Sequence, residues 1–131
     1  MRKLIAFVLG VSCTLLSCKD DVTGGGSSIV FPDSNVSFTQ HVQPLFHERC
    51  TASGCHSGGA PQAGLNLVPP SYNSLMNHTP RLVVAGESNN SLLIQRLDGR
   101  IQPRMPFNQE PLTQNQLTGV RKWIDEGAQN N

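Results

Sequence analysis

Two cysteines and a histidine lie close together near the middle of this chain, in the segment Cys50-Thr51-Ala52-Ser53-Gly54-Cys55-His56. The chain has 131 residues, of which only 5% are aromatic, while 12 are Gly and 9 are Pro. A chain of this length supports one small domain, and its own hydrophobic core is thin. We therefore expect a single loop-rich domain, stabilised by a group bound at this segment.

Three kinds of site fit the Cys-His segment. A c-type haem needs two thiols, which form thioethers with its vinyl groups, and a His directly after the second thiol, which binds the iron. The usual spacing leaves two residues between the thiols, whereas four separate Cys50 from Cys55. The linkage remains feasible if Thr51 to Gly54 loop outward, which small residues and a Gly allow.

The other two readings of the segment are a Cys50–Cys55 disulfide and a zinc site that adds a second His. Zinc wants four ligands, and the other histidines of the chain do not form a second closely spaced pair; they are His41, His47 and His78. The pattern favours haem, with disulfide and zinc as alternatives.

The first residues predict export. Met1-Arg2-Lys3 is positively charged and precedes the apolar run from Leu4 to Leu16, the pattern of a signal peptide. The run is shorter than the roughly 20 apolar residues that a transmembrane helix needs. Leu15-Leu16-Ser17-Cys18 resembles the lipobox of bacterial lipoproteins, which implies cleavage of residues 1–17 and lipidation of Cys18. Lys19-Asp20-Asp21 resembles the surface-export signal of some lipoproteins of the Bacteroidota.

Residues 18–35 are rich in Gly and Ser, with Gly24-Gly25-Gly26-Ser27-Ser28 at their centre. They predict a flexible tether with a span on the order of 20 to 25 Å, and residues 36–131 form the predicted domain. Cleavage would remove Arg2 and Lys3 and leave 8 basic residues against 9 acidic ones, so no basic patch for nucleic acid is expected. The predicted location is the cell envelope, with the lipid in a membrane and the domain on its periplasmic face or at the cell surface.

Two helices carry the clearest patterns. A first helix is expected from Ser37, where Ser37 and Gln40 suit a capping box, with a kink or a late start because of Pro44. A last helix is expected after Thr113, which forms a capping box with Gln116 and ends near Gly127. Short helical pieces are expected at residues 71–77 and 91–97, and no strand pattern stands out.

Further short motifs follow in order along the chain. They are Gly64-Leu65-Asn66-Leu67, Tyr72 with Leu75, Val84-Ala85-Gly86 before Ser91-Leu92, Met105-Pro106, and Leu112-Thr113 followed by Trp123-Ile124-Asp125-Glu126-Gly127-Ala128. From about Ser37 to Ala128, this series resembles the single-haem cytochrome c domains with a long Cys-Cys spacing found in exported bacterial proteins. The resemblance implies an all-α, small cytochrome c-like fold whose terminal helices cross beside a covalently bound haem. Ala85-Gly86 departs from the Pro-Gly that the family often has.

The resemblance also implies a sixth ligand for the iron, and Met105 is the leading candidate because Pro106 follows it, as in the small cytochromes that the chain resembles. A thioether opposite a His favours Fe(II), raises the potential and closes the iron to small molecules. The alternative is that Met105 fills a gap in the core. Met76 lies in an expected helix and is a poorer candidate, and His78 is the fallback if two His bind the iron.

Other side chains receive simpler interpretations. Arg81 and Arg104 are either partners of the haem propionates or solvated surface residues. Trp123 is expected in the core where the terminal helices cross near the haem edge, and His41 and His47 are expected to face solvent.

The function implied by these features is extracytoplasmic electron transfer with one haem c, rather than catalysis. The expected partners are redox proteins, together with the membrane through the lipid, and not nucleic acid. A haem enzyme or gas sensor would need an open sixth site, and peroxidases of the related exported type carry two haem motifs where this chain has one. The third possibility is a structural or binding lipoprotein domain with a Cys50–Cys55 disulfide or a zinc site.

Overall fold

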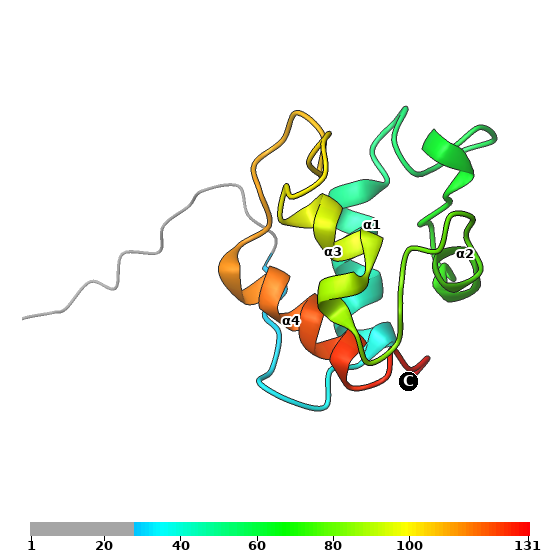
Figure 1. The fold of residues 1–131 in the computed structure, drawn as a ribbon. Helices are drawn as coiled ribbons and strands as arrows, with labels where there is room; N and C mark the ends of the chain where they lie inside the picture. Colours follow the sequence, from blue (N-terminus) through cyan, green and yellow to red (C-terminus); the bar gives the residue numbers. More distant parts are fainter. Residues whose placement is uncertain (1–27) are drawn as a thin grey trace, which may run out of the picture.

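The computed structural model describes residues 28–131, which form helices joined by long loops and contain no strand (Figure 1). The helical segments in chain order are η1 (Phe38–Val42), α1 (Gln43–Cys50), η2 (Gln62–Gly64), α2 (Tyr72–Met76), η3 (Ser88–Asn90), α3 (Leu92–Leu97) and α4 (Gln114–Asp125). The expectation of an all-α domain is met by this part of the chain. The predicted signal peptide, Cys18 and the tether as far as residue 27 lie outside the described residues. None of the helices described is both long and apolar enough to cross a membrane.

The first helix begins at Ser37 and changes its form before Pro44. The Ser37 hydroxyl accepts a hydrogen bond from Gln40 N at 3.1 Å, so the expected cap is present. The reciprocal bond expected from Gln40 is replaced, because Ser37 N donates to Nδ1 of the His41 ring at 3.0 Å. Segment η1 is a π-helical turn and α1 continues it, with Pro44 near the start of α1. Pro44 has no N–H and its ring crowds the preceding turn, so a wide turn at this point suits it.

The last helix, α4, has the ends that the sequence predicts. Gln116 N donates to the Thr113 hydroxyl at 3.2 Å, and Thr113 N donates to the Gln116 side chain at 3.1 Å, which completes the capping box. At the other end Gly127 takes a φ of 106°, and the N–H groups of Gly127 and Ala128 return to helix carbonyls. These contacts satisfy backbone groups that would otherwise lack partners.

The sequence composition predicts that the domain begins at residue 36, but the packed part of the structure begins earlier. Phe31 is 3% exposed, and its backbone N–H and carbonyl both hydrogen-bond the Asn115 side chain on α4. Its ring lies against Gly119, where a Cβ would overlap the ring atoms. Phe31 ends the short apolar run Ile29-Val30-Phe31, which is too short to show a period, and its neighbour Val30 is exposed. Only the tertiary packing identifies Phe31 as a core residue.

Helix α4 packs against α3, η1 and η3, so the first and last helical segments meet (Figure 1). An aromatic cluster lies where they meet: the Phe38 ring centroid is 5.3 Å from that of Trp123 and 5.1 Å from that of Tyr72. Trp123 is 1% exposed and donates its indole N–H to Gln129 O. The expectation that Trp123 is a core residue at the meeting of the terminal helices is confirmed.

Candidate functional site

A cavity of about 680 Å³ is lined by residues of α1, α3 and the connecting loops. Cys50, Cys55, His56 and Met105 all line it. The rest of its wall is mostly apolar and includes Phe46, Leu65, Leu67, Leu82, Leu92, Leu93, Leu97, Pro103, Pro106 and Phe107. Volumes of about 300–1,000 Å³ with apolar walls and a few polar groups are typical of sites for organic cofactors. The four residues singled out in the sequence therefore share one cofactor-sized cavity.

The segment between the two thiols turns outward. Cys55 N donates to Ala52 O at 2.9 Å and His56 N donates to Cys50 O at 3.0 Å, which closes the turn. Ala52, Ser53 and Gly54 are exposed, as the long spacing requires. Gly54 has a φ of 79°, a left-handed conformation that Gly adopts without strain. The four intervening residues thus leave both thiols at the cavity wall.

The His56 ring is oriented by the chain itself. Its Nδ1 lies 3.2 Å from Leu65 O. A carbonyl only accepts hydrogen bonds, so Nδ1 carries a proton, and in the neutral ring the lone pair is on Nε2. His56 O also accepts from Leu67 N at 2.9 Å, which joins the motif to the next loop. A hydrogen bond from the far nitrogen to a carbonyl is the usual arrangement of a metal-binding imidazole.

Cys50 and Cys55 are free thiols in the structure. Burial raises the pKa of the Cys50 thiol to about 12; the charge of Arg49 opposes this rise and that of Cys55 adds to it. Cys50 is therefore a neutral thiol at physiological pH, at the edge of an apolar cavity.

Met105 reaches the cavity from a loop without regular secondary structure. Its backbone N–H donates to Arg96 O at the end of α3 at 2.9 Å, and its side chain is half-buried in the cavity wall. The other methionine of the described residues, Met76 on α2, does not line the cavity. The preference for Met105 over Met76 is consistent with these positions.

His78 also lines the cavity, but both of its ring nitrogens face backbone carbonyls. Nδ1 lies 3.0 Å from Pro80 O, and Nε2 lies 2.9 Å from Ala63 O. In this arrangement neither nitrogen presents a lone pair to the cavity. His47 is exposed, as expected, whereas His41 is only half-exposed because it caps η1 and its ring contacts Phe31.

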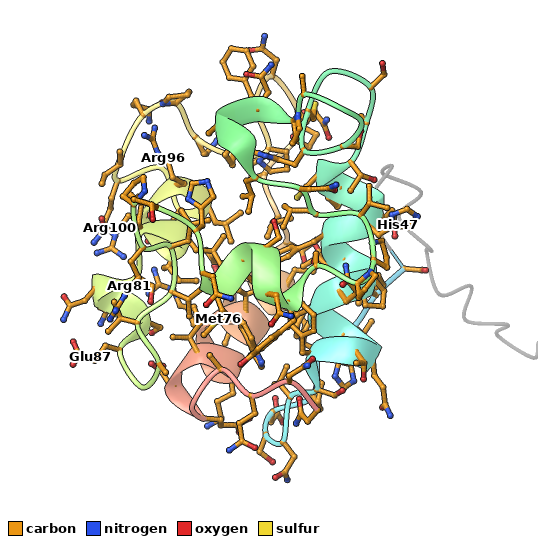
Figure 2. The ribbon with its side chains drawn as sticks, turned by 90° about the vertical axis from the view of Figure 1, so that its right-hand side faces the viewer. His47, Met76, Arg81, Glu87, Arg96 and Arg100 are labelled. Carbon is orange, nitrogen blue, oxygen red and sulfur yellow. The ribbon has the colours of Figure 1, made fainter. Side chains whose placement is uncertain are left out.

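The arginines of the cavity are not those that the sequence suggests. Arg49 and Arg96 line it, whereas Arg81 is exposed outside its wall and Arg104 lies beside Gly99. Figure 2 shows Arg96 on the same side of the molecule as α3, with His47 on the opposite side. Arg49, in the last turn of α1, was not singled out in the sequence; its position directly before Cys50 is the feature that could have identified it. Trp123 is absent from the cavity wall, so it does not lie at the edge of the site.

Comparisons with known proteins add no relative. No family model matches the chain, and no significant match was found among curated proteins or solved structures. Within residues 28–131, no group of three or more His, Cys, Asp or Glu side chains is placed to share a metal ion. The cavity and the residues that line it are therefore the features that bear on function.

Proposed function

We propose that the protein is an electron carrier of the cell envelope that holds one haem c covalently through Cys50 and Cys55. The observation that carries the proposal is the convergence of both thiols, His56 and Met105 on a single apolar cavity. Met105 is far from His56 in sequence, and nothing in the local pattern of either segment requires them to share a cavity. Haem bound there would alternate between Fe(II) and Fe(III).

Each residue of the cavity has a distinct role in this proposal. The two thiols anchor the group to α1 and to the loop that follows it. His56 presents Nε2, because its Nδ1–H is held by Leu65 O. Met105 supplies a thioether, which favours the reduced state and leaves no open position for substrates. The apolar wall excludes water from the group, which also favours the lower-charge state of the iron.

The alternatives receive less support from the described residues. A bis-His site would need His78 to give up a carbonyl partner. Four zinc ligands do not come together in this part of the chain. An enzyme or gas sensor would need a displaceable sixth ligand, and Met105 has its backbone fixed by Arg96 O. The domain is proposed to reach its redox partners while anchored to a membrane by the lipid on Cys18.

The test of this function is covalent haem. We expect the chain, produced with a cytochrome c assembly system, to gain the mass of one haem and to stain for haem after denaturing electrophoresis. The double variant Cys50→Ser/Cys55→Ser should lose the covalent haem, and the matched control Ser53→Ala, in the same exposed turn, should keep it. A wild-type chain without the added mass would overturn the proposal.

A further inference from the structure

The loop that carries Met105 is positioned by arginines rather than by secondary structure. Residues 98–113 contain no helix or strand. Arg96 Nη1 donates to Gln102 O, and Arg104 Nη2 donates to Gln109 O at 2.9 Å. The first bond holds the loop to α3, and the second joins two parts of the loop itself. Neither reaches the opposite wall of the cavity, which carries Cys50, Cys55 and His56.

Arg49 makes the connection across the cavity. Its Nη2 donates to Glu110 O at 2.8 Å, and this bond joins α1 to the end of the Met105 loop. Arg49 is only 7% exposed although it carries a full charge. The salt bridges among residues 28–131 both use Asp98, so no carboxylate neutralises Arg49. Asp and Glu are also absent from the cavity wall.

A buried guanidinium without a carboxylate is costly, because desolvation of a charge is offset only by good partners. One carbonyl and the C-terminal end of α1 offset part of this cost. An apolar side chain of similar length would fill the same space without that cost. The presence of Arg therefore points to a use for its charge and its hydrogen bond in the finished site.

We infer that Arg49 is a positioning residue for the sixth ligand: it fastens the Met105 loop to α1 and places a buried positive charge in the cavity wall. The inference rests on the proposed function and deepens it. The hydrogen bond keeps Met105 over the cavity and so keeps the sixth position closed. The positive charge disfavours Fe(III) relative to Fe(II), because the oxidised centre carries one more positive charge.

Two variants of the holoprotein distinguish the effect of the hydrogen bond from the effect of the positive charge. Arg49→Gln removes the charge and the charge-assisted hydrogen bond. We expect carbon monoxide to bind the reduced protein roughly tenfold faster or more, the factor expected for loss of such a bond. We also expect the Fe(III)/Fe(II) equilibrium to move toward Fe(III) by on the order of tenfold, or about 59 mV. Arg49→Lys keeps the charge and loses the planar fork, so the potential should stay near the wild-type value while carbon monoxide still binds faster.

Two control variants test whether the effects are specific to Arg49 and to the backbone carbonyl of Glu110. Glu110→Ala should behave as wild type, because the acceptor is the backbone carbonyl and not the carboxylate. Arg81→Gln, which removes an exposed charge outside the cavity wall, should change neither readout. The inference is overturned if Arg49→Lys binds carbon monoxide at the wild-type rate, or if Arg49→Gln changes the potential no more than Arg81→Gln does. If Arg49→Gln does not accumulate as holoprotein, the rate at which carbon monoxide binds reduced Arg49→Lys decides whether the inference stands.

Failure of this inference is distinct from failure of the proposed function. A wild-type chain without covalent haem contradicts the function itself. A wild-type chain with covalent haem but without Met ligation leaves the haem attachment intact and overturns the role of Arg49.

Discussion

Gly119 is a position where the absence of a side chain is a packing requirement. It lies inside α4, where Gly is ordinarily less favourable than Ala by roughly 1 kcal/mol. A Cβ there would overlap the ring of Phe31, which is itself only 3% exposed. Packing thus outweighs helix propensity at this residue.

Gly119→Ala should therefore destabilise the protein by about 1–3 kcal/mol, the usual cost of overpacking a core. Urea unfolding of the holoprotein measures it, and the exposed neighbour Thr118→Ala should change stability by less than about 0.5 kcal/mol. If Gly119→Ala stabilises the protein, propensity is the larger effect and Phe31 does not pack on α4 in solution.

If the protein binds haem as proposed, Met105 decides between an electron carrier and a haem protein with an open sixth site. If its sulfur binds the iron, the oxidised protein should show the weak near-infrared charge-transfer band of Met-to-ferric ligation. Met105→Ala should abolish the band, lower the potential and let carbon monoxide bind the reduced iron, while the thioethers and His56 retain the haem. Met76→Ala is the matched control, because Met76 does not line the cavity, and it should leave all three readouts unchanged. An unaltered spectrum and potential in Met105→Ala would assign Met105 to core packing.

At the scale of the elements, one carboxylate links the end of α3 to α4 through ion pairs. Asp98, just after α3, forms ion pairs with Arg100, at 2.8 Å, and with Arg121 on α4. Burial alone would raise the pKa of Asp98, but the hydrogen bonds from Arg100 and the charges of Arg100 and Arg121 outweigh it and hold the pKa below its usual 3.8. A lowered pKa means that the folded state binds this proton less tightly than the unfolded state does.

The contribution of Asp98 to stability is therefore present above pH 3.8 and disappears as the pH falls through its lower folded-state value. Asp98→Asn should lower the free energy of unfolding by up to about 1 kcal/mol at pH 7, in the range of partly exposed ion pairs. The difference from wild type should vanish in strong acid. Urea titrations at several pH values measure this, with the exposed Asp33→Asn as control. A difference that persists unchanged into strong acid would show that the carboxylate charge is not responsible.

At the scale of the whole molecule, the predicted membrane anchor and the folded domain are separable. The core side chains of the described structure all lie within residues 29–131. Cys18→Ser with a signal peptide for soluble export should release a red, folded protein, because the predicted Gly/Ser tether separates the anchor from the core. Fractionation of cells and the visible spectrum of the soluble fraction test this. Wild type with the native signal should remain with the membranes, and a Cys18→Ser chain that aggregates without haem would contradict the separation.

Local sequence chemistry was sufficient for the elements that depend on neighbouring residues. The capping box of Thr113, the end of α4 at Gly127 and the disturbance at Pro44 follow from backbone hydrogen bonding within a few residues, and the structure confirms them. The outward turn between Cys50 and Cys55 follows in the same way from the spacing of the thiols and from Gly54. Short-range patterns encode short-range geometry.

Contacts between distant segments required the tertiary structure. The burial of Phe31 against Gly119, the bond from Arg49 to Glu110 O and the exclusion of Arg81 from the cavity wall join residues with no fixed spacing along the chain. The sequence by itself determined the helix ends and singled out the candidate site residues, because these depend on side-chain chemistry and local hydrogen bonds. Only the tertiary structure decided which charges face the cavity and where the core begins, because packing depends on how loops bring remote segments together.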